Sequence, residues 1–291
     1  MAGAGRAEER LENIESVEPI LSALRSVSQA SMQAARRRAE GAERYGRELL
    51  GLAGWLPEPA REQEDGEEEE GEVRAGTLLI ALGSDRGLCG PFNQDVVNAL
   101  ADQLAGVEAE GRRAEVWALG LRLRYPLAEL EIRPERGERF AEGSVPDFER
   151  AYQLAEGIQA GVRQGWYDRV RLILNRPLRA DRTRTQVEQL LPLELEEEDL
   201  GKDSWPPPIV ETDPEGLRER IRRQALEVNL YWYLLRSSAA EHTARFHLLE
   251  DAAQNMDRLT EELEMEVQLA RQQAITTEMM DLIAAAGLIK S

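Results

Sequence analysis

The chain has 291 residues, and its 36 basic against 55 acidic side chains give a formal net charge of −19 at pH 7. This acidic balance argues against nucleic acid as a partner, because phosphate binding needs a positively charged face. A single cysteine, Cys89, excludes an internal disulfide framework, and with only two histidines beside it the sequence argues against a zinc site. No apolar run is long enough to predict a membrane-spanning helix, and the first ten residues do not have the pattern of a signal peptide.

A long helix is predicted for residues 6–50, where apolar and small residues recur at steps of three and four. Pro19 interrupts the rhythm, so we expect either a kink at that point or a helix start near Glu18. Further on, residues 36–38 are three consecutive arginines. They form either a solvated helix face or a contact to an acidic partner surface. The segment defines a first domain, a coiled-coil helix over residues 1–56.

An acidic linker is predicted for residues 57–76. The run from Glu62 to Glu70 has no apolar side chain to bury, and its like charges repel one another, so we expect a flexible segment there. The alternative is that residues 62–72 act as an electrostatic brake or as a docking tail.

The hydrophobic pattern changes at Thr77, and residues 77–210 are predicted to form a Rossmann-like α/β sheet domain of about 130 residues. Short apolar runs with β-branched residues predict strands, and the amphipathic stretches between them predict helices. Strands are expected at 77–82, 114–119, 170–174 and 186–193, and helices at 93–104 and 147–162.

The last domain, residues 211–291, is predicted to be a second coiled-coil helix. From Leu217 onward neither proline nor glycine occurs until Gly287, which is roughly 70 residues against about 11 or 12 in an average helix. Its second half carries an apolar seam at coiled-coil steps. The seam consists of Leu249, Ala252, Met256, Leu259, Leu263, Val267, Ala270 and Ala274.

A seam of this length needs a partner, because an apolar stripe is not stable in water. We therefore expect the two terminal helices to pair as an antiparallel coiled coil, with the sheet domain inserted between them. The C-terminal helix is the longer one and should project beyond the pair. A long helix within an ordinary bundle is the alternative.

The glycine-rich loop at residues 83–90 links a predicted strand to a predicted helix, as phosphate-binding loops do. It lacks the lysine and hydroxyl residue of the phosphate-binding motif G-x-x-x-x-G-K-[ST], and it lacks the glycine spacing of the dinucleotide-binding motif G-x-G-x-x-G. No nucleotide cofactor is therefore expected. Cys89 could serve as a nucleophile if Arg86 lowered its pKa. However, both histidines lie on the long C-terminal helix, and no base is implied beside the thiol.

Two stretches together carry a resemblance to a known family. Residues 84–90, Ser-Asp-Arg-Gly-Leu-Cys-Gly, with Asn93 just after them, resemble the signature loop of the γ subunit of F-type ATP synthases. Residues 270–278, Ala-Arg-Gln-Gln-Ala-Ile-Thr-Thr-Glu, are similar to the motif near that family's C-terminus. Shorter matches lie in the same order at 190–193, 204–205, 213–214 and 244–255.

The resemblance implies a central-stalk rotor shaft that couples ion flow through a membrane ring to ATP chemistry on other subunits. It implies a non-catalytic chain without cofactors, and as partners the α and β subunits of the hexamer, the ε subunit and the ring of c subunits. It also implies a peripheral position on the cytoplasmic face of the inner membrane. Residues 282–289 would form a smooth apolar tip inside the hexamer.

The matching motifs imply contacts with partner subunits. Arg86 and Cys89 would face a lever of a β subunit, while Gly87 and Gly90 would permit the turn. On the helix, a second β-subunit contact would be made by Arg271, Gln272, Ile275 and Thr276.

The chain also differs from the family pattern. It carries residues 18–24, Glu-Pro-Ile-Leu-Ser-Ala-Leu, where the family has a lysine-rich segment, and its charge is acidic. Two alternatives therefore stay open: a γ-like paralogue that acts as a non-rotating scaffold or inhibitor of an ATPase hexamer, and a small-molecule enzyme that uses the loop of the sheet domain.

Overall fold

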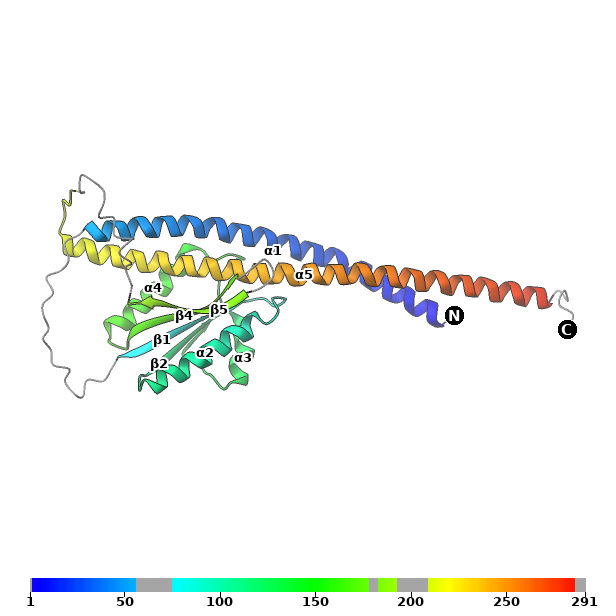
Figure 1. Ribbon diagram of the computed structural model, residues 1–291, viewed down its shortest axis with the longest axis horizontal. Helices are drawn as coiled ribbons and strands as arrows, with labels where there is room; N and C mark the ends of the chain where they lie inside the picture. Colours follow the sequence, from blue (N-terminus) through cyan, green and yellow to red (C-terminus); the bar gives the residue numbers. More distant parts are fainter. Residues whose placement is uncertain (1, 56–74, 178–182, 193–208, 286–291) are drawn as a thin grey trace. The chain divides into compact units, whose positions relative to one another are not determined.

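The computed structural model describes residues 2–55, 75–177, 183–192 and 209–285 (Figure 1). Contacts divide the chain into two compact units, one made of residues 1–28 and 246–291 (unit 1) and the other of residues 29–245 (unit 2). The boundary between the units falls within both long helices. It differs from the domain boundaries expected from the sequence, which stay a prediction. Some predicted segments lie outside the described residues. They are residues 57–74 of the linker, the tip beyond Ala285, and the motif matches at Leu193 and at residues 204–205.

Both terminal segments are helical, as predicted: α1 spans Ala2–Trp55 and α5 spans Pro214–Ala285. Helix α1 does not begin near Glu18 but passes through Pro19. A proline inside a helix removes one backbone donor, which here would have bonded to the carbonyl of Glu15, but it leaves the turns on either side able to form. No helix in the described ranges is long and apolar enough to cross a membrane.

The two helices run antiparallel within each unit. In unit 1, Glu8 pairs with Arg271 and Arg25 pairs with Glu250, so that the numbering rises along one helix and falls along the other. In unit 2, Arg36 donates to Thr243 Oγ1 and Gln224 donates to the Tyr45 hydroxyl in the same sense.

Side-chain burial shows where the helices pack. In unit 1 the predicted seam residues Leu263 and Val267 are buried against Ala7, Leu11 and Ile14. Two members of the predicted seam, Leu259 and Ala274, are exposed instead. In unit 2 small residues of α1, among them Ala39 and Ala42, pack against Leu235 of α5.

Unit 2 also contains the inserted domain, a five-stranded sheet in the order β3-β2-β1-β4-β5. All neighbouring strands are parallel except β4 and β5, which are antiparallel. The strands are β1 Gly76–Leu82, β2 Ala114–Leu119, β3 Arg136–Glu138, β4 Tyr167–Pro177 and β5 Thr183–Leu191. The connecting helices are α2 Phe92–Ala109, η1 Leu121–Leu123, α3 Arg124–Glu129 and α4 Phe148–Arg163.

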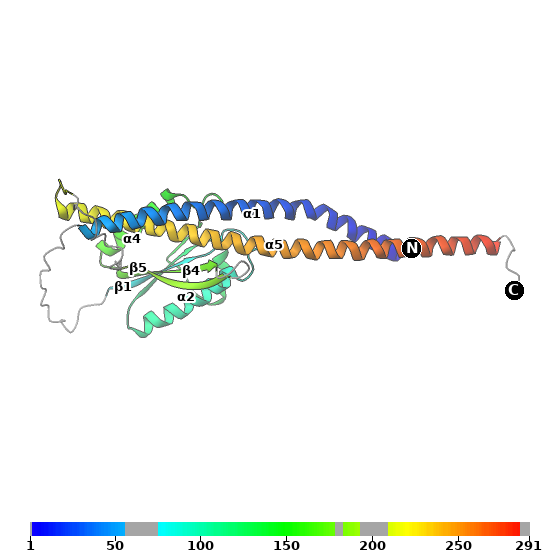
Figure 2. The same cartoon turned by 45° about the horizontal axis from the view of Figure 1, so that its top comes forward.

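Strand β1 is buried on both faces, and its alternate side chains belong to two cores. Leu78, Ile80 and Leu82 pack in a cluster with residues of α4 and α5. Leu79 and Ala81 pack on the other face with residues of α2 and α3. Figures 1 and 2 show α2 on one side of the sheet and α5 on the other. The sheet domain is therefore held to α5 through a shared core.

Every predicted strand and helix of this domain is present, with ends that shift by up to five residues. The sequence analysis did not predict β3, η1 or α3, all of which are short. The strand predicted at 186–193 is part of β5, which begins at Thr183 and ends at Leu191.

Candidate functional site

The loop at residues 83–90 leaves the carboxyl end of β1 at a point where two backbones nearly touch. A Cβ on Gly83 would lie 2.4 Å from Leu123 Cγ, and one on Gly120, whose φ is 130°, would lie 2.7 Å from the Gly83 carbonyl carbon. Both positions therefore require glycine. The close approach allows the loop to turn over the end of β2 without a gap beneath it.

Asp85 fixes the loop to two other segments of unit 2. Its carboxylate accepts hydrogen bonds from the backbone N–H groups of Leu121 at 3.1 Å and of Ala141 at 3.2 Å, and its two oxygens share the N–H of Phe140. Amide donors from three residues on one carboxylate hold it in one position. Asp85 is thus a structural anchor of the loop.

Arg245 of α5 holds the loop from the opposite side. It donates through Nε to the Gly87 carbonyl at 3.0 Å and through Nη2 to the Arg86 carbonyl at 3.1 Å. It also pairs with Glu241 at 2.5 Å, and both side chains are more than nine-tenths buried. Burial raises the pKa of Glu241, and the charge of Arg245 opposes that rise. The sequence analysis quoted Arg245 only as part of a motif match and missed its partner, although opposite charges four residues apart within a stretch of small residues are a readable signal.

His242 is the third buried polar group in this cluster. Its Nε2 lies 2.7 Å from the Ser144 carbonyl and its Nδ1 lies 3.2 Å from Arg245 Nη1. Nε2 must therefore carry the proton, and Nδ1 accepts from the guanidinium. Burial lowers the pKa of His242 to about 4, with a further contribution from the positive charge of Arg245. The ring is neutral and ties α5 to the segment before α4.

The loop turns its two central side chains in opposite directions. Cys89 is only 4% exposed and packs with Phe92 and Ala240, whereas Leu88 is 53% exposed. Both Leu88 and Gly90 have a φ of 61°, while Gly87 does not adopt a positive φ. The turn therefore depends on Gly90 and on a strained leucine.

Burial raises the pKa of the Cys89 thiol, and the nearest polar atoms are Ser84 Oγ at 3.5 Å and Asn93 Nδ2 at 3.6 Å. Burial therefore opposes the lowered pKa that a nucleophilic Cys89 would need, and the sequence already implied no base beside the thiol. Of the loop residues predicted to touch a partner, the structure exposes Arg86 and Gly90 and buries the side chain of Cys89. Leu88, which the prediction omitted, is the exposed apolar side chain.

The second predicted contact lies in unit 1. Arg271, Gln272, Ile275 and Thr276 of α5 are all exposed, and their spacing of three and four places them on adjoining parts of one helix surface. Arg271 donates to Glu8 Oε1 at 2.7 Å in a pair that is largely solvated. Thr276 donates to the Gln272 carbonyl at 2.8 Å. All four side chains are therefore accessible, and those of Arg271 and Thr276 each make a contact within the chain.

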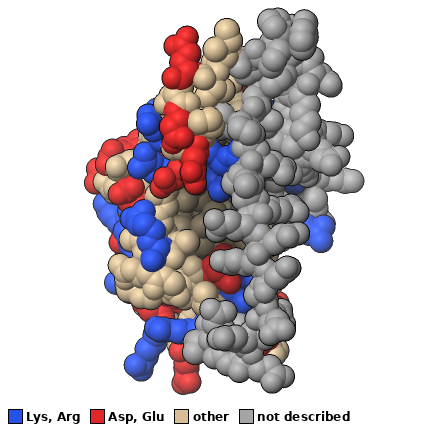
Figure 3. All heavy atoms as spheres, turned by 90° about the vertical axis from the view of Figure 1, so that its left-hand side faces the viewer, with Lys and Arg blue, Asp and Glu red and all other residues tan. Residues whose placement is uncertain are grey.

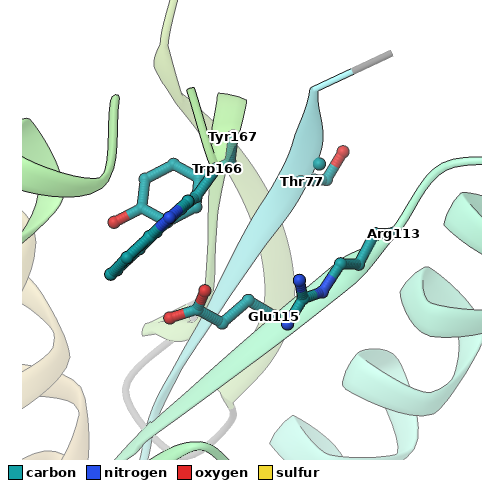
Figure 4. A pocket seen from close by; sticks show the side chains of 6 residues that line it. Thr77, Arg113, Glu115, Trp166 and Tyr167 are labelled. Atoms are coloured by element: carbon teal, nitrogen blue, oxygen red, sulfur yellow. The ribbon is translucent and has the colours of Figure 1, made fainter. Parts of the chain in front are cut away.

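A cavity of about 300 Å³ lies at the amino ends of the parallel strands (Figure 4). In that view Glu115, Trp166 and Tyr167 extend to one side of β1, and Thr77 and Arg113 lie toward the other. Ligand crevices of α/β sheets lie at the opposite, carboxyl ends. Burial raises the pKa of Tyr167 to about 12, so its phenol stays protonated at neutral pH. The described residues contain no cluster of side chains that could hold a metal ion. We find no catalytic arrangement of side chains in this cavity.

The paired chain ends, the inserted sheet and a loop fixed to the long helix define a class of protein, a coiled-coil subunit with an α/β domain. Comparisons with known proteins agree with this class. A family model described as ATP synthase matches residues 5–287. The ATP synthase gamma chains of Trichlorobacter lovleyi and Moorella thermoacetica are 30% and 27% identical to this chain, and in each comparison all of both chains is covered.

Solved structures show the same fold at lower identity. A chain of the rotor of the Euglena gracilis mitochondrial ATP synthase has a TM-score of 0.59 at 18% identity and covers 94% of this chain and 99% of its own. A chain of the central stalk and c-ring of the Tetrahymena thermophila enzyme has a TM-score of 0.55 at 21% identity and covers 80% and 99%. The chain belongs to the ATP synthase gamma-chain family.

Proposed function

We propose that this chain is the central-stalk rotor shaft of a rotary ATP synthase, coupling ion flow through a membrane ring to ATP synthesis or hydrolysis on partner α and β subunits. The observation that carries the proposal is the antiparallel pairing of the two chain ends around an inserted sheet domain, in a chain whose whole length matches gamma chains. A shaft must transmit torque along its length, and two helices that pack on each other resist bending better than one.

The proposed partners are the α and β subunits of the hexamer, the ε subunit and the ring of c subunits. The chain itself is proposed to have no catalytic activity, because its one thiol is buried with a raised pKa and its most buried histidine is neutral and hydrogen-bonded. It would be a peripheral protein on the cytoplasmic face of the inner membrane, held there through the complex. A chain without catalytic activity fits a mechanical role, with the ATP chemistry carried out by the partner subunits.

Within this proposal two surfaces contact β subunits. The first is the loop at 83–90, which presents Arg86 and Leu88 to solvent on a base fixed by Asp85 and Arg245. The second is the exposed surface of α5 around Arg271, Gln272, Ile275 and Thr276. Cys89 contributes by holding the loop in place, since its own side chain faces inward.

The experiment deletes the chromosomal gene for this chain and measures ATP synthesis by inverted membrane vesicles. Loss of the chain should abolish coupled synthesis, and the chain should purify with an α/β hexamer. A chain that purifies with the hexamer and yet is dispensable for coupled synthesis would instead be a scaffold or an inhibitor.

Arg271→Gln tests the second surface, with Glu8→Gln as its matched control. Both substitutions remove the same intramolecular ion pair, which is exposed and worth only about 0–1 kcal/mol. If Arg271 binds a β subunit, only Arg271→Gln should lower coupled synthesis, by about tenfold, because hydrogen bonds to charged groups contribute about 1.5–3 kcal/mol. Equal losses in both variants would show that Arg271 serves only the helix pair.

A further inference from the structure

A groove in unit 2 is bounded by four elements where α1, α4 and β5 end and α5 begins. Its volume is about 530 Å³, within the range of small-molecule sites. Ile221, Ala225 and Leu226 of α5 are buried and form the deepest part of its apolar lining. The remaining apolar lining is contributed by Leu50, Val162, Leu191 and Pro192. Among the described residues, all four elements therefore contribute apolar side chains to the groove.

Basic side chains surround this apolar surface. Arg163, Arg218, Arg222 and Arg223 line the groove, against the single acidic residue Glu219. Arg223 interacts electrostatically with Glu227. Within the described ranges the other three arginines form no ion pair and donate no hydrogen bond, whereas arginines such as Arg112, Arg150 and Arg245 are paired. Figure 3 views the chain from this end, where both basic and acidic side chains reach the surface.

A group of arginines without ion-pair partners is unexpected in a chain with a net charge of −19. These arginines favour an occupant that carries a negative charge. An uncharged apolar molecule would occupy only the apolar lining and make no use of the guanidinium groups, which would stay solvated. A polyanion such as a nucleotide would place polar groups against the apolar residues, which is unfavourable. A molecule with one alkyl chain and one carboxylate satisfies both parts, since guanidinium and carboxylate form paired hydrogen bonds.

We propose that this groove binds the anion of a single-chain fatty acid, with the alkyl chain on the apolar lining and the carboxylate on the arginines. The volume suits one chain of medium length and not the two chains of a phospholipid. The proposal does not depend on the rotor function.

The test is isothermal titration calorimetry of the purified full chain with dodecanoate, below its micelle concentration and at pH 8, where the carboxylate is ionised. We expect saturable binding of one molecule per chain. Dodecyl maltoside, which has the same alkyl chain and an uncharged head, should bind at least about tenfold more weakly, because it cannot form charge-assisted hydrogen bonds. Hydrogen exchange followed by mass spectrometry should show protection of residues 218–226 on binding.

The double variant Arg218→Gln and Arg222→Gln should weaken dodecanoate binding by about tenfold or more. Arg124→Gln is the matched control, since Arg124 is an exposed arginine of the same unit that lies outside the groove, and it should leave the affinity unchanged. Val162→Gln, on the half-exposed part of the lining, should weaken dodecanoate and dodecyl maltoside alike.

Four results would overturn the proposal: no saturable binding, equal affinity in the double variant and the control, binding to phospholipid vesicles but not to dodecanoate, or binding that appears only after residues 194–199 are deleted. The last result would identify the chain's own acidic segment as the occupant.

Discussion

Arg245 is the residue that joins the loop after β1 to the long helix α5. It donates to the carbonyls of Arg86 and Gly87 and pairs with Glu241 in a buried site. Removing one member of a buried pair leaves the other charge without a partner, which costs more than the pair contributes to stability.

We expect Arg245→Met to lower the free energy of unfolding by about 3–5 kcal/mol, as measured by urea denaturation. Glu241→Gln combined with Arg245→Met should recover part of this loss, because it removes the unpaired carboxylate. A loss below about 1 kcal/mol in the single variant, the size expected for an exposed pair, would contradict the assignment.

His242 gives the molecule a predictable response to acid. Its pKa is lowered mainly by burial, to about 4, from about 6.5 in the unfolded chain, so the unfolded chain binds this proton first. The neutral ring therefore contributes stability that is fully present above about pH 6.5 and is lost as the pH falls towards 4.

We expect His242→Gln to remove this part of the pH dependence. A glutamine can donate to the Ser144 carbonyl and accept from Arg245, but it does not titrate. Between pH 6.5 and 4 the wild-type chain should lose up to about 3 kcal/mol more than the variant, measured by urea denaturation at each pH. Parallel pH profiles would show that His242 titrates normally.

The loop shows where sequence reasoning stops at the scale of single residues. The motif located the turn, but the orientation of each side chain depends on φ angles that residue types do not determine. A positive φ at Leu88, which is unusual for a non-glycine residue, turns its side chain outward, while Cys89 faces inward. The anchoring roles of Asp85 and His242 were missed because the backbone groups that they contact lie far along the chain. The pair of Glu241 with Arg245 was missed although its spacing of four residues can be read from the sequence.

At the scale of elements, the strands and long helices were predictable because their signals are local. The apolar run at 77–82 forms β1, and the long stretch without proline or glycine after Leu217 forms most of α5. Strand β3 could not be found in the same way, because only three residues form it and their partner is β2. At Pro19 the alternative of a helix start near Glu18 was wrong, because α1 continues through the proline, and the alternative of a kink stays a prediction.

Two glycines within helices of the sheet domain should respond in opposite ways to alanine. A Cβ at Gly161 of α4 would lie 2.2 Å from the Tyr167 hydroxyl, whereas one at Gly106 of α2 would meet no atom within 4 Å. We expect Gly161→Ala to destabilise the chain by about 1–3 kcal/mol through overpacking, and Gly106→Ala to stabilise it by about 0.5–1 kcal/mol through helix propensity. Thermal unfolding of both variants measures this, and destabilisation by Gly106→Ala would indicate an unrecognised contact on α2.

At the scale of the molecule, the pairing of the chain ends was predictable from the apolar seam, which needs a partner along its length. Leu263 and Val267 found that partner in Ala7 and Leu11. The pairing of Arg271 with Glu8 is the last ion pair that α5 makes with α1 among the described residues. Beyond it, the side chains of Ile275, Met279 and Leu282 are exposed. These apolar side chains are therefore available to a partner.

A chain that ends at Ala274 separates folding from function. Residues 275–282 are exposed, so their removal should change the free energy of unfolding by less than about 0.5 kcal/mol. Coupled ATP synthesis in membrane vesicles should fall severalfold, since the shaft would lose the apolar surface proposed to turn within the hexamer. A lowered urea midpoint would mean that the tip packs on the chain itself. Unchanged synthesis would mean that the torque passes through the loop at 83–90 and the contacts before Ala274.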